Sequence, residues 1–332
     1  MRTLRRPRSA ETMPDAGRPG RGRLQAISGR RKLRRPGPAA GEYREATSVR
    51  AEPARGGGRR DARPVLPLRP DSGRKRGQHT ARYLFKDWPG VSRRLRAAPC
   101  VALFTDFDGT LVPIQPRANR VRLPQAGRRL LARLVRHPRI RLWIVSARKL
   151  ADLRRRTGGV GVRLAGLHGW EREDARPPAV AGREALRQAA KRLRERLRGL
   201  RGIWMEDKEW TLAIHYRGAG EAAVRRARAA LREVLRPLAP ALRPMLGKKV
   251  WEVIPREMES RGKAVRNLLA EGSPDSLPVY IGDDFSDESA FRALRWGITV
   301  HVGTNRMTCA RYYLRSPQEV MIFLERIERE IS

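Results

Sequence analysis

The sequence contains very little cysteine. Its 332 residues include only Cys100 and Cys309, which lie far apart and outside any C-x-x-C spacing. Small secreted domains rely on several paired cysteines, and structural zinc sites need clustered Cys or His ligands, so the sequence indicates neither. We therefore expect a protein of a reducing compartment, the cytoplasm, that folds around an apolar core.

Long apolar stretches are also missing. The sequence has no run of about 18 apolar residues, the length that a membrane-spanning helix requires. The arginines near the start of the chain are not followed by the apolar segment of a secretory signal. We therefore expect no association with a membrane and no secretion.

Acidic residues are scarce beside basic ones. The chain has 73 Lys and Arg against 34 Asp and Glu, which gives a formal net charge of +39, and about half of this excess lies in residues 1–100. Such a charge attracts polyanions. No zinc-finger, RNP or helix-turn-helix signature accompanies it, so we interpret most arginines as solvated surface residues. Specific nucleic-acid binding is not expected, although the basic amino-terminal segment could bind polyanions non-specifically.

The amino-terminal part differs in composition from the rest of the chain. Residues 1–95 are dominated by Arg, Pro, Gly and Ala and show little sustained apolar periodicity. Such a segment cannot bury enough apolar surface to offset the entropy lost on folding, so we expect a disordered basic tail. A start codon assigned upstream of the true one would leave the same pattern.

From about residue 98 onward the pattern is that of a parallel α/β sheet. Short apolar runs without polar alternation are typical of strands buried on both faces. Four such runs occur, at residues 101–105, 140–145, 278–282 and 298–302. Amphipathic helical segments separate them, as crossover connections between parallel strands require.

The middle of the chain has a different character. Residues 171–255 combine two helical segments with the alternating run 210–217 and the strand 250–254, which predicts a smaller sheet with one exposed face. The expected architecture is therefore α/β, a Rossmann-like parallel-sheet core with an inserted α+β cap domain. The core would consist of residues 96–170 and 256–332.

Carboxylates gather where two of the core strands end. Asp106 and Asp108 follow the first strand, and Asp283, Asp284 and Asp287 follow the third. Ligands of open parallel sheets bind beyond the carboxyl ends of the strands. Aspartates can also serve as helix caps or turn residues. Two clusters on one sheet edge favour a cation site instead, and hard oxygen ligands with room for water select Mg²⁺.

The motif D-x-D-G-T at residues 106–110 resembles the first motif of the haloacid dehalogenase superfamily of phosphotransferases. The resemblance extends over residues 98–330. It implies that Asp106 is a nucleophile that forms an aspartyl-phosphate intermediate. It also implies that Asp108 protonates the leaving oxygen and then activates water.

The same resemblance assigns further roles at the strand ends. Ser146 begins Ser-Ala-Arg where Ser-Gly-Arg is usual, and it would bind the phosphate, while Arg148 would contact the substrate. The magnesium ligands implied by the resemblance are Asp106, Asp108, Asp283, Asp284 and Asp287.

Within the superfamily, the chain resembles the trehalose-6-phosphate phosphatases. The shared motifs are D-x-D-G-T-L-x-P-I at residues 106–114, A-G-x-H-G at 165–169, E-x-K at 206–208, H-Y-R at 215–217, K-x-V-x-E-x-x-P at 248–255 and G-D-D-x-S-D-E-x-A-F at 282–291. In the last motif, Ser286 replaces the usual threonine. The resemblance implies that the sugar is held by His168, Glu206, Lys208, Lys249 and Glu252.

One motif departs from the family pattern. The family usually has Asp-Lys-Gly where this chain has Ser260-Arg261-Gly262, followed by Lys263. A cation here is expected to balance the phosphate and the nucleophile, and Arg and Lys are not interchangeable at a tight site. Either Arg261 or Lys263 would take this catalytic role.

The sequence favours one function and leaves two alternatives. The favoured function is the hydrolysis of trehalose 6-phosphate to trehalose and phosphate, the last step of trehalose biosynthesis. The first alternative keeps the chemistry but changes the substrate, for example to glucosyl- or mannosyl-glycerate phosphate. The second is a polyanion-binding protein that acts through its basic tail. The sequence indicates no oligomeric state.

Overall fold

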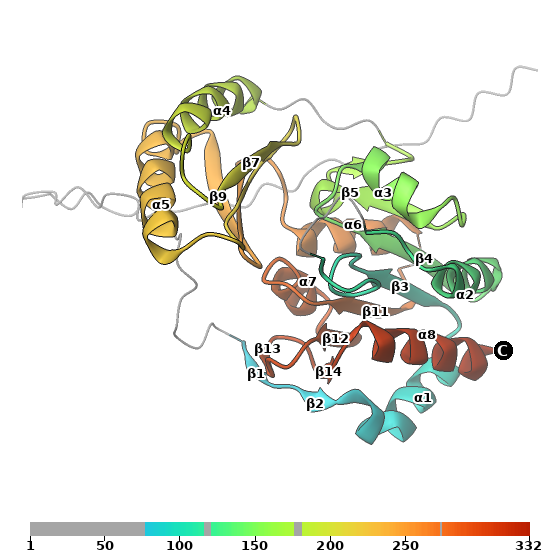
Figure 1. Ribbon diagram of the computed structural model, residues 1–332. Helices are drawn as coiled ribbons and strands as arrows, with labels where there is room; N and C mark the ends of the chain where they lie inside the picture. The colour runs from blue at the N-terminus through green and yellow to red at the C-terminus, as the bar shows by residue number, and fades with distance from the viewer. Residues whose placement is uncertain (1–76, 116–120, 176–180, 273) are drawn as a thin grey trace, which may run out of the picture. The chain divides into compact units, whose positions relative to one another are not determined.

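The protein is represented by a computed structural model that describes residues 77–115, 121–175, 181–272 and 274–332 (Figure 1). Its main sheet has the strand order β2-β14-β12-β11-β3-β4-β5-β6. These strands are β2 (Arg82–Tyr83), β3 (Val101–Thr105), β4 (Ile140–Val145), β5 (Arg163–Gly166), β6 (Glu171–Arg172), β11 (Leu277–Gly282), β12 (Ile298–Val302) and β14 (Tyr312–Leu314). Neighbouring strands run parallel except for β6, which is antiparallel to β5. The expected parallel α/β core is confirmed.

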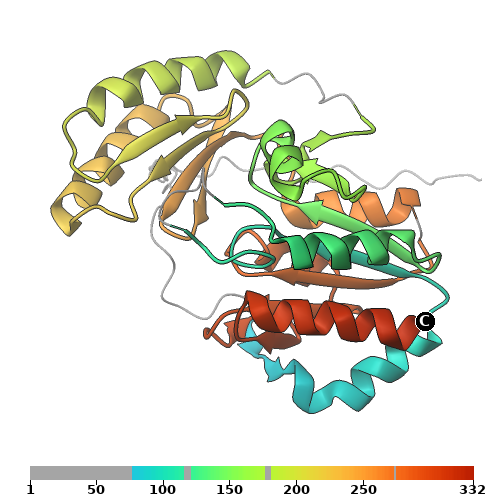
Figure 2. The ribbon, with the colours of Figure 1, turned by 45° about the vertical axis from the view of Figure 1, so that its right-hand side comes forward.

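Helices cover both faces of this sheet (Figures 1 and 2). Leu103 and Phe104 are consecutive in β3 and point to opposite faces. Leu103 packs in a cluster with the first layer of helices: α1 (Trp88–Ala97), α2 (Gln125–Arg136), α3 (Leu150–Thr157) and α8 (Pro317–Ile331). Phe104 packs in a cluster with the second layer: α6 (Arg261–Gly272) and α7 (Glu288–Ala293). Double burial explains why the central strands are apolar without alternation.

The ordered core begins earlier than residue 96. Residues 77–95 belong to the structure, where they form β1 (His79–Thr80), β2, the 3₁₀ helix η1 (Leu84–Asp87) and most of α1. Leu84, Val91 and Leu95 are fully buried against the sheet. The expectation of disorder is therefore wrong for this segment, because three well-spaced apolar residues anchor it despite the basic residues between them. The remainder of the expected tail lies outside the described residues.

The inserted region forms a second sheet with its own helical layer. The antiparallel strand order is β7-β8-β10-β9. The elements are α4 (Arg183–Arg196), β7 (Trp204–Asp207), β8 (Leu212–His215), α5 (Glu221–Leu235), β9 (Leu242–Gly247) and β10 (Val250–Pro255). Leu193 of α4 and Leu231 of α5 pack with Ile214, Trp251 and Val253 of the sheet. The helices therefore cover one face of this cap sheet, an α+β arrangement.

The other face of the cap sheet is less exposed than its alternating sequence predicts. Ala213 of β8 and Glu252 of β10 point away from the cap helices, yet they are 0% and 4% exposed. Glu252 contacts His168 of the core, so part of this face is covered. Residues 171 and 172 form β6 in the core sheet, so the insertion begins after Arg172.

Within the described residues, no helix combines the length and the apolar character needed to cross a membrane. The remaining small elements are the strand β13 (Met307–Thr308), which pairs with β1, and the 3₁₀ helix η3 (Leu167–Gly169), which follows β5. Because η3 lies at the end of β5, it adds His168 to the edge of the sheet where β3 and β11 also end.

Candidate active site

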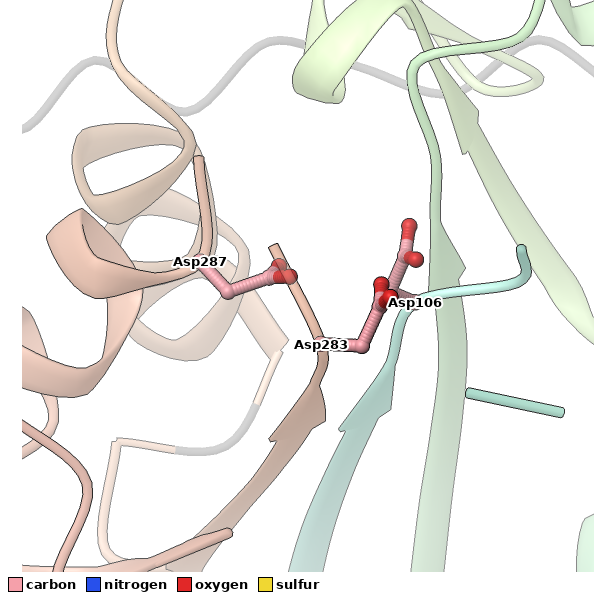
Figure 3. A group of neighbouring side chains, drawn as sticks. All are labelled: Asp106, Asp283 and Asp287. Carbon is pink, nitrogen blue, oxygen red and sulfur yellow. The ribbon is translucent and has the colours of Figure 1, made fainter. Parts of the chain in front are cut away.

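Three aspartates meet at the carboxyl edge of the core sheet (Figure 3). Asp106 follows β3, Asp283 follows the adjacent parallel strand β11, and Asp287 precedes α7. Each offers a carboxylate oxygen, and these oxygens lie within 4.8 Å of one another. All three residues are buried. Asp108 and Asp284, the other expected metal ligands, are outside this group.

Crowding and burial shift the titration of these carboxyl groups. Burial raises the pKa of Asp106. Burial, reinforced by the negative charge of Asp284, raises the pKa of Asp283 to about 7. Burial and the charge of Asp287 raise the pKa of Asp284 to about 6. A bound divalent cation would favour the charged forms, so the donor chemistry fits a hard cation such as Mg²⁺.

Gly109 allows the close approach of Asp283. Its φ is +83°, a left-handed conformation that favours glycine, and a Cβ at this position would lie 2.1 Å from Asp283 Oδ2. The glycine of the D-x-D-G-T motif is therefore required for two reasons, the turn and the space for the carboxylate.

Arg261 places a cation beside Asp106. It is the first residue of α6 and is 3% exposed. Its Nη1 donates to Asp106 Oδ1 at 3.2 Å and to Asp287 Oδ1. Lys263 is exposed and its Nζ lies 2.6 Å from Glu259 Oε1. Of the two candidates that the sequence left open, the structure brings Arg261 and not Lys263 to the carboxylates.

A chain of buried polar side chains leads from Arg261 into the cap. Arg261 Nη2 lies 3.1 Å from His168 Nδ1, and His168 Nε2 lies 2.5 Å from Glu252 Oε2. Lys208 Nζ donates to Glu252 Oε1 at 2.6 Å and to the carbonyl oxygen of Ala147 at 3.0 Å. Burial opposes the charge of Glu252, but Lys208 and His168 outweigh it and hold the pKa of Glu252 far below its usual range.

Asp108 is paired with Arg148. Arg148 donates from Nε to Asp108 Oδ2 at 2.6 Å and from Nη2 to Asp108 Oδ1 at 2.8 Å, a bidentate arrangement. Arg148 Nη1 also donates to Asp152 at 2.8 Å. Ser146 is buried, and its Oγ accepts a hydrogen bond from the backbone nitrogen of Arg148 at 3.2 Å. The serine, Arg148 and Asp108 thus form one hydrogen-bonded unit.

Glu206 lies in the same row of the cap sheet as Glu252. Glu206 pairs with Ala213, which pairs with Glu252, so the two carboxylates project from one face. Glu206 is half exposed and lies 3.1 Å from His215 Nε2, and the His215 ring stacks on Trp204. The hydrogen bond to His215 lowers the pKa of Glu206.

Two residues of the site were not expected from the sequence. Lys248 Nζ donates to Asp283 Oδ2 at 3.1 Å, whereas Lys249 is exposed at the turn between β9 and β10 with φ at +66°. Lys248 is the first residue of the K-x-V-x-E-x-x-P motif, and this position could have identified it as a site residue from the sequence. The Tyr280 hydroxyl donates to Asp287 Oδ1 at 2.7 Å, and its place inside an apolar strand gave no indication of this role.

The fold, with its carboxylates at the strand ends, is haloacid dehalogenase-like. The structure is similar to a haloacid dehalogenase-like hydrolase from Bacteroides thetaiotaomicron, with a TM-score of 0.50 and 16% identity over 69% of this chain and 98% of that one. It is also similar to the C-terminal domain of C. albicans trehalose-6-phosphate phosphatase, with a TM-score of 0.66 and 22% identity over 76% of this chain and 99% of that one.

The family follows from the sequence comparison. The trehalose-phosphatase family profile matches residues 104–318, so the chain belongs to the trehalose-phosphatase family. A trehalose-phosphate phosphatase of Mycolicibacterium paratuberculosis is 35% identical over 70% of this chain and 63% of its own length. One of Mycobacterium leprae is 33% identical over 70% of this chain and 58% of its own length. The chain thus spans about 60% of these curated relatives.

Proposed function

We propose that this protein hydrolyses trehalose 6-phosphate to trehalose and inorganic phosphate, in the cytoplasm and with Mg²⁺ as cofactor. The observation that carries the proposal is the continuous polar connection from Asp106 through Arg261 and His168 to Glu252 of the cap. This connection joins Asp106 and Arg261, which suit phosphoryl transfer, with Glu252, which suits a ligand that carries many hydroxyls. The relatives from Mycolicibacterium paratuberculosis and Mycobacterium leprae are trehalose-phosphate phosphatases by name.

Asp106 is the proposed nucleophile. Its carboxylate oxygen attacks phosphorus, and the bond from phosphorus to the sugar oxygen breaks. Arg261 orients the carboxylate by holding Oδ1. The buried Nε of Arg261 has no hydrogen-bond partner among the described residues, and a phosphoryl oxygen would satisfy it. The hydroxyl of Ser146 is the proposed second phosphate contact.

Asp108 is the proposed general acid and base. It gives a proton to the departing sugar oxygen, then takes one from the water that cleaves the aspartyl phosphate and so regenerates Asp106. Because Arg148 occupies both oxygens of Asp108, we propose that Asp108 leaves this pair and turns toward the substrate when it binds. Arg148 is then available to the phosphate.

Asp106, Asp283 and Asp287 would hold the magnesium ion, with Asp284 and Asp108 as supporting groups. The cation, when bound, supplies positive charge that offsets the charge of the phosphate and the carboxylates. The raised pKa values of Asp106 and Asp283 support this assignment, because burial disfavours their negative charge and a bound cation would offset that cost.

The cap would recognise the sugar. Trehalose carries many hydroxyls and no charge, so carboxylates that accept and ammonium groups that donate suit it. Glu206, Lys208 and Glu252 lie on the cap face opposite the cap helices and are the proposed sugar ligands. Lys249, which the family resemblance suggested, is exposed in this structure and is left out of this set.

Phosphate release tests the proposal. Trehalose 6-phosphate is compared with glucosyl- and mannosyl-glycerate phosphates and simple hexose phosphates, each with Mg²⁺ and with a chelator. We expect the highest kcat/KM for trehalose 6-phosphate, dependence on the cation, and a loss of at least ~1,000-fold in Asp106→Asn. Preference for another sugar would reassign the substrate, and turnover by Asp106→Asn at the wild-type rate would refute the nucleophile.

A further inference from the structure

Two histidines of the site contact cap carboxylates through the same ring atom. His168 Nε2 lies 2.5 Å from Glu252 Oε2, and His215 Nε2 lies 3.1 Å from Glu206 Oε2. They differ in their second ring nitrogen, because His168 Nδ1 lies 3.1 Å from Nη2 of Arg261. The cap carboxylate Glu252 is therefore connected to the arginine that holds the nucleophile. The partner of Glu206, His215, instead stacks on Trp204, which also belongs to the cap.

The direction of these hydrogen bonds is determined. A guanidinium group only donates, so His168 Nδ1 must accept and be unprotonated. The remaining ring proton is then on Nε2, from which it donates to Glu252. Burial lowers the pKa of His168, in agreement with a neutral ring. His168, Arg261 and Glu252 are each less than 5% exposed, so little water competes for these bonds.

The backbone of His168 is also unusual. Its φ is +62° and its ψ is +21°, a left-handed conformation that costs free energy in residues other than glycine. Its amide nitrogen donates to the carbonyl oxygen of Ser146 at 2.8 Å. This turn places the ring between Arg261 and Glu252, and such a conformation persists where the surroundings hold it.

The arginine in this chain is what makes the connection possible. Nη1 of Arg261 donates to Asp106 and Asp287 while Nη2 is directed at His168, so the planar group bridges two sets of partners. The lysine usual in the family has a single nitrogen and cannot span both in this way. The replacement of the usual lysine by Arg261 therefore makes the contact with His168 possible.

We propose that His168 is a positioning residue that couples sugar recognition at Glu252 to the orientation of Arg261 and Asp106. The proposal rests on the proposed function of Glu252 as a sugar ligand. When sugar hydroxyls fix Glu252, the carboxylate fixes the His168 ring, and the ring restrains the guanidinium that holds Asp106 Oδ1. Binding of the correct sugar then increases the rate of phosphoryl transfer as well as the affinity. The reason is that small errors in the placement of the nucleophile reduce this rate strongly.

The test compares His168→Ala with His215→Ala, using trehalose 6-phosphate and the sugar-free ester p-nitrophenyl phosphate. For His168→Ala we expect kcat with trehalose 6-phosphate to fall about 30-fold while KM changes less than about threefold. The loss with p-nitrophenyl phosphate should be at least about tenfold smaller, because this ester does not engage Glu252. His215→Ala should instead raise KM for trehalose 6-phosphate and retain kcat.

Three results would overturn the proposal. Equal losses with both esters would mean that His168 only supports Arg261 structurally. A higher KM with unchanged kcat would make His168 a sugar ligand. An Arg261→Lys variant that keeps the wild-type ratio of kcat between the two esters would show that the two guanidinium nitrogens are not needed for the coupling. If His168→Ala does not fold, His168→Asn takes its place, since asparagine tolerates the left-handed conformation.

Failure of the proposed function gives a different result. If wild-type protein prefers another sugar phosphate, that ester replaces trehalose 6-phosphate in the same comparison, and the coupling is tested unchanged. If wild-type protein hydrolyses all sugar phosphates no better than p-nitrophenyl phosphate, no sugar recognition exists for His168 to transmit, and both proposals fail.

Discussion

The core and the cap build their parts of the site in different ways. In the core, Asp106, Asp283 and Asp287 come from two short motifs at the ends of adjacent parallel strands, and all are buried. In the cap, Glu206 and Glu252 are distant in sequence and come into one row through cross-strand pairing. Glu206 is half exposed and Glu252 is buried.

This difference indicates a division of roles. Arg261 holds buried carboxylates in an arrangement in which charge is costly and must be balanced, and this suits the proposed phosphoryl transfer. The cap presents hydrogen-bonding groups on an antiparallel sheet, and Glu206 contacts another cap residue, His215. Substitutions of the core carboxylates or of Arg261 should therefore impair the reaction of any phosphate ester, whereas a substitution of Glu206 in the cap should act on the sugar.

The largest effect is expected for Arg261→Met. Removal of the guanidinium leaves Asp106 and Asp287 buried without their cation, so kcat should fall by about 100- to 1,000-fold with sugar phosphates and with p-nitrophenyl phosphate alike. Steady-state kinetics with both esters check this. Arg266→Met, an exposed position on the same helix α6, is the control and should change kcat less than about twofold. A loss confined to sugar phosphates would contradict the assigned role.

Gly109→Ala should have the next largest effect, about tenfold to 100-fold on kcat, because the new Cβ would displace the Asp283 carboxylate. Gly159→Ala is a matched control. Gly159 has a similar φ of +71°, but among the described residues beyond its chain neighbours no atom would lie within 4 Å of a Cβ there, so it carries the backbone cost alone. Measurements of phosphate release and thermal unfolding in both variants separate the cost of the left-handed backbone from the cost of displacing Asp283. Equal activity in the two would show that space for Asp283 is unimportant.

The core was predictable from the sequence because its signals are local. The strands at residues 140–145 and 298–302 were expected with the bounds that the structure has, since buried apolar runs and their flanking turns define them. The edge strands β7 and β9 and the helix α1 were not expected. β7 has only four residues, β9 contains Pro244, and α1 is rich in arginine, so tertiary contacts rather than periodicity stabilise them.

The site was predictable to the extent that it lies at strand ends. The meeting of Asp106, Asp283 and Asp287 follows from parallel strands that end at one edge. The sequence did not predict which of Arg261 and Lys263 faces the carboxylates. Residues two apart on a helix point in directions about 200° apart, so only one of the two can face the site. The sequence indicated Lys249 alone, and the contact of Lys248 with Asp283 depends on a turn whose left-handed residue is Lys249, which the sequence does not reveal.

In the cap, Glu206→Gln sharpens the comparison. The substitution weakens the hydrogen bond to His215 and the acceptor for sugar hydroxyls, so we expect kcat/KM for trehalose 6-phosphate to fall about tenfold, mainly through KM. Because Glu206 is half exposed, the melting temperature should barely change. Glu233→Gln, which removes a surface ion pair with Arg196 on the cap helices, is the control for charge. A fall in kcat with unchanged KM would place Glu206 in the chemistry instead.

The raised pKa of Asp283 predicts how stability depends on pH in metal-free protein. Its folded pKa of about 7 lies above the unfolded value of about 4, so the folded state binds more protons between these limits. This group's stabilising contribution is therefore full below pH 4 and is lost as the pH rises through 7. We expect wild-type protein to lose several degrees more than Asp283→Asn in melting temperature between pH 5 and pH 8. Identical pH profiles would contradict the shift.

The smallest effect is expected for Lys263→Ala. Lys263 is exposed on α6 and its ion pair with Glu259 is at the surface, so kcat and KM should change less than about twofold, and stability by about 0.5 kcal/mol or less. The value of this variant lies in its contrast with Arg261, two residues earlier on the same helix. Were Lys263→Ala to lose activity as Arg261→Met does, the lysine would have to reach the phosphate in a conformation different from this one, and the assignment of the cation beside Asp106 would need to be revised.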